Sequence, residues 1–335
     1  MEFDQSSQPN FKVYKWRFVN LALLCACLMM VMFQSLVYAA IGNVTTKFYQ
    51  VSYTSASFTA LTLNIIAMLC SHPLGLLAAK LGYRETLIWC TFLNAFGACI
   101  KCFSIKRSFV ILIIGQIFVT FAYPMILILI SVMVTTWFNQ SEFEAVQGIT
   151  MSFVGWGWAL SFLTPLIFKN TKNFLDVNEA LNNLSVTLAS ITLIIFLFTL
   201  LLAKDKPNTP PSRAEQMLND MDHHSYVVLF KNINFILLMI SCGLLNAIDM
   251  SMFITLNQSV FDVFQNGYSV TTIAGVLLCF GGILGISYPV EVSIASGLTL
   301  ACLNLMAILS VPLVSELITR FGAVKANLLL PFIGM

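Results

Sequence analysis

A single acidic residue, Asp249, stands inside a long apolar run of the sequence. A charged side chain at the centre of a membrane helix costs roughly 3 kcal/mol on insertion scales, so it is expected to face a cavity or a partner. Asn246 lies three residues earlier and shares its helix face. A carboxylate beside an amide suits the binding of a cationic substrate or of a proton. The alternative is an acid near the outer end of its helix that reaches water.

Two tryptophans in another apolar run offer aromatic faces, which attract cations. Trp156 and Trp158 are two residues apart and therefore about 200° apart on a helix, so only one of them can face a cavity. The alternative for both is helix packing or anchoring at the membrane interface.

Polar side chains occur in two further apolar runs. Gln34 and Tyr38 are four residues apart and share one helix face. The amide of Gln34 needs partners, which either a cavity or a helix–helix hydrogen bond can supply. Tyr123 offers a hydroxyl beside the kink expected at Pro124, with the same two alternatives.

No arrangement in the sequence predicts catalysis or a bound metal. His72 is a lone histidine among apolar residues, and packing is favoured there over a role in sensing pH or binding haem iron. His223 and His224 lie in a polar loop, where metal or haem binding is again the less favoured interpretation. Most of the nine cysteines lie in apolar runs. We therefore expect no cofactor and no enzymatic activity.

The composition indicates the elements that must position these side chains. The chain has 335 residues, of which 58% are hydrophobic and 10% are charged, whereas a soluble domain carries about 25% charged residues. The net charge of +2 includes no basic cluster dense enough for nucleic acid. The sequence therefore predicts an all-α protein inside a lipid bilayer.

A membrane-spanning helix needs about 20 mostly apolar residues. Nine runs meet this need, and a tenth begins near Ala326. We expect a cytoplasmic N-terminus at residues 1–17, a six-helix half at 18–203, a cytoplasmic central loop at 204–232 and a second half at 233–335. The nine runs are Phe18–Ile41, Phe58–Ala79, Thr86–Phe103, Phe109–Val134, Ala145–Phe168, Leu184–Ala203, Ile233–Leu256, Val270–Pro289 and Val292–Val314.

The basic residues before the first span favour a cytoplasmic N-terminus. The sequons at Asn43 and Asn183 then lie outside and are predicted glycosylation sites. Neither a cleaved signal peptide nor a retention or organelle signal is recognised, so a monomeric multi-pass protein of the plasma membrane is expected. Six spans, a basic loop and a second half are the layout of the major facilitator superfamily, whose members bind substrate near the midplane between two halves that rock around it.

Short motifs, in order along most of the chain, carry a closer resemblance. The chain resembles the feline leukaemia virus subgroup C receptor-related transporters, and this resemblance implies choline and ethanolamine transport, with haem transport also assigned to the family. We therefore expect a carrier, with a receptor or an inactive isoform as the alternative. The motifs are Lys47–Ser52, Leu81–Arg84, Leu93–Gly97, Gly115-Gln116, Trp137-Phe138 with Glu142, Lys206–Ala214, Phe230–Leu238, Ser287–Pro289 and Ala295–Leu298.

The resemblance also implies further site positions. The family's choline-binding Trp and Tyr fall at Ser35 and Met250, and two of its polar positions fall at Tyr123 and Asn304. The aromatic cage of the family is therefore altered here. The loop residues Lys80, Gly82 and Arg84 match the superfamily's loop between spans two and three, and they are expected to gate helix motion rather than bind substrate.

The resemblance breaks in the second half. Gly281–Gly285 resembles the eighth span, whereas Ser287–Pro289 resembles the segment after the tenth. We therefore expect that spans nine and ten are absent, and that the last span is incomplete at Met335. This predicts about nine or ten membrane helices where the family has twelve.

Overall fold

The computed structural model describes residues 14–106, 108–171, 173–206, 233–286 and 294–327. Within these ranges the chain is a bundle of long helices, and eight of them are long and apolar enough to cross a membrane. Each of the nine predicted runs corresponds to a helix. The tenth run, from Ala326, lies almost entirely outside the described residues.

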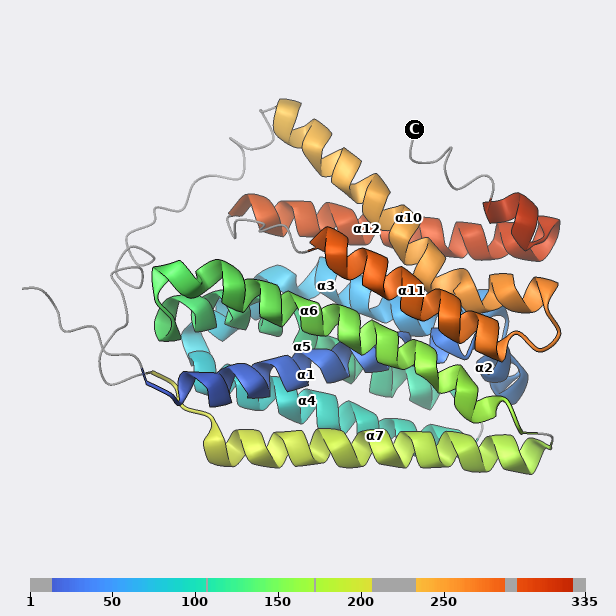
Figure 1. Cartoon of the computed structure of the whole chain (residues 1–335), viewed down its shortest axis with the longest axis horizontal. Helices are drawn as coiled ribbons and strands as arrows, with labels where there is room; N and C mark the ends of the chain where they lie inside the picture. Colours follow the sequence, from blue (N-terminus) through green and yellow to red (C-terminus); the bar gives the residue numbers. More distant parts are fainter. Residues whose placement is uncertain (1–13, 107, 172, 207–232, 287–293, 328–335) are drawn as a thin grey trace, which may run out of the picture.

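Six of the long helices form a first bundle, with α2 as a short insertion after α1 (Figure 1). Its largest core cluster brings together apolar side chains of α1, α4, α5 and α6. The elements are α1 (Arg17–Ala40), α2 (Gly42–Tyr49), α3 (Tyr53–Leu81), α4 (Tyr83–Phe103), α5 (Phe109–Trp137), α6 (Phe143–Leu163) and α7 (Phe174–Leu202), with 3-10 turns η2 (Ser104–Lys106), η3 (Gln140–Glu142) and η4 (Thr164–Phe168).

Three helices form a second group: α10 (Ile233–Val263), α11 (Tyr268–Ile286) and α12 (Ile294–Phe321). In Figure 1 they lie beside α3 and α6, on the side of the first bundle away from α4 and α7. The helix α11 packs mainly against α6, whereas α12 packs against α10 and α3. Although α11 and α12 are consecutive, their described residues make little contact with each other.

The structure corrects several predicted helix ends. The helix α10 continues to Val263 rather than ending at Leu256, because the polar residues that follow are buried and paired with other helices. One of these is Gln258, whose amide donates to the Ser315 carbonyl and accepts from the Ser315 hydroxyl in α12. The helix α7 begins at Phe174 rather than Leu184, with a capping box at Asn173.

The helices α4 and α5 approach closely at two glycines. A Cβ atom at Gly97 would lie 2.5 Å from the carbonyl oxygen of Gly115, and one at Gly115 would lie 2.6 Å from Cγ of Lys101. Such distances are too short for any side chain, so only glycine permits this packing. The contact brings polar residues of both helices together inside the first bundle.

Gln50, between α2 and α3, is the only described residue other than glycine with a positive φ, at 54°. The left-handed conformation costs a side chain with a Cβ roughly 1–2 kcal/mol. We predict that Gln50→Gly raises the stability of the protein by about 1 kcal/mol, because glycine adopts this conformation freely. Thermal unfolding in detergent measures the gain. Gln50→Asn should show a smaller gain and Gln50→Ile a loss, and an unchanged midpoint in all three would contradict the prediction.

An ion pair fixes the start of α1 to the turn before α6. The Arg17 guanidinium binds both carboxylate oxygens of Glu142, with Nη1–Oε2 at 2.6 Å and Nη2–Oε1 at 3.1 Å. The guanidinium also lies 4.7 Å from the ring centre of Phe18 and 4.8 Å from that of Phe138. The hydrogen bonds from Arg17 lower the pKa of Glu142 below its ordinary value.

A lowered folded-state pKa stabilises the fold at pH values above the ordinary pKa of the carboxyl group, and this stability is lost as the pH falls through the lowered value. We therefore predict that Glu142→Gln lowers the thermal midpoint at neutral pH, and that the difference from the parent protein shrinks in acid. A pH series of thermal midpoints measures this. Glu144→Gln, which removes an exposed carboxylate two residues later, is the matched control and should show no such convergence.

Candidate functional site

One face of α10 turns toward the first bundle, and Asp249 lies on it. Asn246, Phe253 and Asn257 share this face at helical spacing, and each contacts another helix. The amide of Asn246 donates to the Leu303 carbonyl of α12 at 2.8 Å. Asp249 is exposed in the middle of α10 and forms no hydrogen bond or ion pair with the residues that the structure describes. An unpaired acid is thus available on this face.

An aromatic contact lies one helical turn beyond Asp249. The rings of Trp158 in α6 and Phe253 in α10 have centres 5.2 Å apart. Met250 packs against the same cluster, which joins both groups of helices. The cluster also contains Leu36 and Ala40 from the C-terminal end of α1. Of the two candidate tryptophans, Trp158 therefore faces the second group, whereas Trp156 is 46% exposed on the other side of α6.

Hydrogen bonds join the two groups at the same end of the molecule. The side chain of Asn257 accepts from the backbone N–H of Asn43 at 2.7 Å and donates to the Ala40 carbonyl at 2.8 Å and to Oδ1 of Asn43 at 3.0 Å. The hydroxyls of Thr54 in α3 and Ser315 in α12 lie 3.3 Å apart. The two groups are therefore held together where α1 ends.

Gln34 and Tyr38 do not join Asp249, because they point into the first bundle. The amide of Gln34 donates to Oδ1 of Asn94 in α4 at 2.5 Å, which is the helix–helix alternative. Tyr38 is buried, with its ring beside the ammonium of Lys101. Tyr123 packs against the core cluster of the first bundle. The sequence-predicted residues are thus divided between two places.

The remaining predicted positions lie close to the α10 face or within α1. Asn304 is buried in α12, directly after the residue that accepts from Asn246. Ser35 is buried in α1, and its hydroxyl donates to the Met32 carbonyl. Met250 and Trp158 therefore meet where the two groups join, Asp249 lies next to Met250 on α10, and Asn246 and Asn304 lie at the neighbouring contact of α10 with α12.

The residues predicted to gate motion contact only the first bundle. The Arg84 guanidinium donates to the Ala203 carbonyl at 2.9 Å, just past the C-terminus of α7, where positive charge is favourable. Gly82 has a φ of 82°, and a Cβ there would lie 3.0 Å from Oδ1 of Asp205. Lys80 is exposed. These contacts fix α4 to the end of α7.

The two predicted glycosylation sites differ in accessibility. Asn43 is only 3% exposed and paired with Asn257, so this sequon is not available for a glycan in this conformation. Asn183 is exposed on α7, and its glycosylation stays a prediction. His72 is exposed on α3, and the described residues hold no cluster suited to a metal. His223 and His224 lie outside them.

Sequence reasoning missed a buried polar cluster in the first bundle. Lys101 lies inside the predicted run Thr86–Phe103 but was not singled out as a candidate; it is 1% exposed in the last turn of α4 and donates to Oε1 of Gln116 at 3.1 Å. The heptad spacing of Asn94 and Lys101 on α4 is the signal that could have revealed it.

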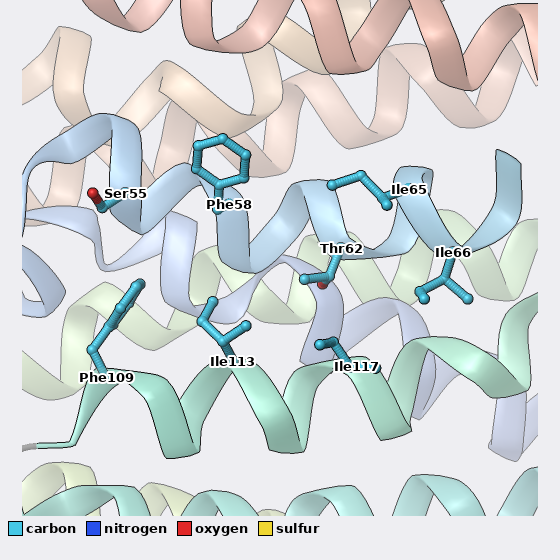
Figure 2. Close-up of a pocket in the computed structure, with 8 residues that line it drawn as sticks. All are labelled: Ser55, Phe58, Thr62, Ile65, Ile66, Phe109, Ile113 and Ile117. Atoms are coloured by element: carbon cyan, nitrogen blue, oxygen red, sulfur yellow. The ribbon is translucent and has the colours of Figure 1, made fainter. Parts of the chain in front are cut away.

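A pocket of about 390 Å³ lies elsewhere, between α3 and α5. Figure 2 shows side chains of both helices facing each other across it. It contains none of the predicted substrate-binding residues and no charged group, and the Thr62 hydroxyl already donates to the Thr59 carbonyl. Its lining is Ser55, Phe58, Thr62, Ile65, Ile66, Phe109, Ile113 and Ile117.

Comparisons with known proteins agree with this architecture. The sequence profile of the Major Facilitator Superfamily matches residues 22–335. The chain is 27% identical over 288 residues to the choline/ethanolamine transporter flvcr2a of Danio rerio, covering 84% of this chain and 61% of that protein. It is also 27% identical to the choline/ethanolamine transporter FLVCR1 of Mus musculus, covering 83% of this chain and 53% of that protein. The chain thus spans about half to three-fifths of the length of these relatives.

Solved structures share the fold at low identity. A bacterial homologue of the human lysosomal transporter Spinster, in an inward-facing and unoccupied conformation, matches with a TM-score of 0.64 and 11% identity, covering 96% of this chain and 80% of that one. The xylose transporter XylE of E. coli, in an inward open conformation, matches with a TM-score of 0.65 and 10% identity, covering 95% of each chain.

Proposed function

Because the chain belongs to the major facilitator superfamily, we propose that it is a membrane carrier for a small organic cation such as choline or ethanolamine. The observation that carries this proposal is the exposed, unpaired carboxylate of Asp249 on the α10 face that meets the first bundle. An acid inside a membrane helix marks a path for ions or substrates. The curated relatives named above are choline/ethanolamine transporters.

The surrounding side chains suit an ammonium group. The carboxylate supplies the counter-charge, and the Trp158–Phe253 contact supplies aromatic faces one turn away. Asn246 and Asn304 add amides beside the same region. Haem, the other expected substrate, stays a prediction: His72 is the only histidine among the described residues, and no His, Cys, Asp or Glu cluster stands near Asp249.

We also propose on which side of the membrane this conformation is closed. Basic residues before α1 favour a cytoplasmic N-terminus, so the end of α1 faces outward. The contacts of Asn257 and of the Trp158–Phe253 cluster lie at that end. The proposed carrier is therefore closed toward the outside, in a monomer at the plasma membrane, and alternating access requires this contact to break.

Uptake into proteoliposomes tests the proposal. Purified protein should accumulate radiolabelled choline or ethanolamine with time, and unlabelled substrate should compete. Liposomes carrying the same protein with Asp249→Asn are the matched control. Saturable binding without accumulation would instead indicate a receptor, and the absence of both binding and uptake would contradict the proposed substrate class.

A further inference from the structure

Lys101 is a buried lysine that the proposed substrate region does not use. Its ammonium donates to Oε1 of Gln116 in α5 and lies 5.7 Å from the ring centre of Tyr38 in α1. No carboxylate forms an ion pair with it among the residues that the structure describes. Burying an amine without a carboxylate partner is costly, because the group must either lose its hydration as a cation or give up its proton, so fold stability alone does not explain a lysine here.

The Lys101 contact belongs to a circuit of three hydrogen bonds between α1, α4 and α5, in which Asn94 and Lys101 are joined only through the α4 backbone. From Gln116 in α5, the amide nitrogen donates to the backbone carbonyl of Gln34 in α1 at 2.9 Å. The side-chain amide of Gln34 donates to Asn94, which returns the circuit to α4. All four side chains are nearly or fully buried. The circuit therefore ties α1 to both α4 and α5 over about two turns of α4.

The opposite face of α1 forms the contact between the two groups of helices. Leu36 lies about 200° from Gln34 around the helix, and Ala40 lies about 240° from it. Both belong to the cluster that contains Phe253 of α10. A force that separates the two groups at this end therefore acts on α1. The circuit on its other face transmits that force to α4 and α5.

We propose that Lys101 is a positioning residue of the transport cycle: by holding Oε1 of Gln116, it aims the Gln116 amide at the Gln34 carbonyl, so that α1 moves with the first bundle as one body. Without the circuit, α1 follows the second group when the two groups separate, and the end of the molecule fails to open fully. The chain keeps a costly buried lysine because it couples the helices during motion. The uptake part of this inference rests on the proposed function.

Lys101→Met tests the inference, because methionine fills similar space without a donor. We expect a thermal midpoint equal to or above that of the parent protein, since a buried amine without a carboxylate partner is removed. We expect a maximal uptake rate about tenfold lower, with KM changed less than about twofold. Lys101→Arg, which keeps a cationic donor, should restore most of the rate. Lys47→Met removes an exposed lysine near the same end and should change neither quantity.

Alkylation of the native cysteines measures whether α1 separates from the first bundle, and it needs no substrate. Cys27 is fully buried on the α1 face that carries Gln34, whereas Cys279 is buried in α11. In Lys101→Met, N-ethylmaleimide should modify Cys27 about tenfold faster, as located by mass spectrometry, and Cys279 should stay protected. If the single variant folds poorly, the double variant Lys101→Met/Gln116→Leu replaces it. This variant removes both members of the Lys101–Gln116 hydrogen bond and should show the same faster modification of Cys27.

Two results would overturn the inference. One is a lower thermal midpoint with Cys27 and Cys279 exposed together, which indicates a merely structural lysine. The other is unchanged alkylation of Cys27 in both variants. If the parent protein takes up neither choline nor ethanolamine while Lys101→Met exposes Cys27 selectively, the proposed substrate fails and the role of Lys101 in holding α1 stands.

Discussion

Replacing Asp249 by asparagine is expected to lower the uptake of choline and ethanolamine by about ten- to a hundredfold, equivalent to about 1.4–2.8 kcal/mol. The amide keeps the size of the side chain and removes the charge that balances the substrate. The loss matches the worth of a hydrogen bond to a charged group, about 1.5–3 kcal/mol. Initial uptake rates over a range of substrate concentrations, in proteoliposomes with equal protein content, measure it.

Two control variants test whether the loss of uptake comes from the missing charge at position 249. Asp249→Glu keeps the charge and should retain part of the uptake. Glu316→Gln removes an exposed acid of α12, which pairs only with Arg320 among the described residues, and should leave uptake unchanged. If Asp249→Asn leaves both the rate and its pH profile as they are, Asp249 does not contact the substrate and the proposed site is wrong.

Asn257→Ala is expected to shift the protein toward the conformation that is open at the end of α1. The change removes three hydrogen bonds and leaves the Ala40 carbonyl and the Asn43 amide buried without their partner. Each buried group left unpaired costs about 1–3 kcal/mol. A coupling of this size changes the ratio of the two conformations by about five- to 150-fold.

The distance between spin labels at Lys47 and Phe264, both exposed at this end, measures the shift. The distribution should gain a longer component in Asn257→Ala. Gln258→Ala is the matched control, because the neighbouring amide bonds to Ser315 and Thr319 within the second group and not to α1. A longer component in both variants, or in neither, would contradict the role assigned to Asn257.

The membrane helices were largely predictable, because each needs a long apolar run and the runs are plain in the sequence. Their ends were less predictable. Hydropathy ends a span at its first polar residues, but Asn257 and Gln258 are buried and paired, so α10 continues beyond them. Such pairing depends on residues more than fifty positions away, which a local pattern does not contain.

The candidate site was predictable in part for the same reason. Helical spacing correctly placed Asn246 and Asp249 on one face, and it separated Trp156 from Trp158. Spacing does not say which neighbour a helix face meets. It therefore could not predict that Gln34 and Tyr38 point into the interior of the first bundle. Lys101 was missed because a basic residue near the end of an apolar run ordinarily reaches the membrane surface, and hydropathy does not show that its ammonium is buried.

The separation of α11 from α12 has a consequence for biogenesis. Because α11 packs against α6 and α12 packs against α3 and α10, each finds its partner in a segment that the ribosome has already completed. Gly275 of α11 sits directly against the ring of Phe162 in α6, so a larger residue at this position would clash with a helix that is synthesised earlier. Both α11 and α12 thus pack against segments that precede them in the chain rather than against each other.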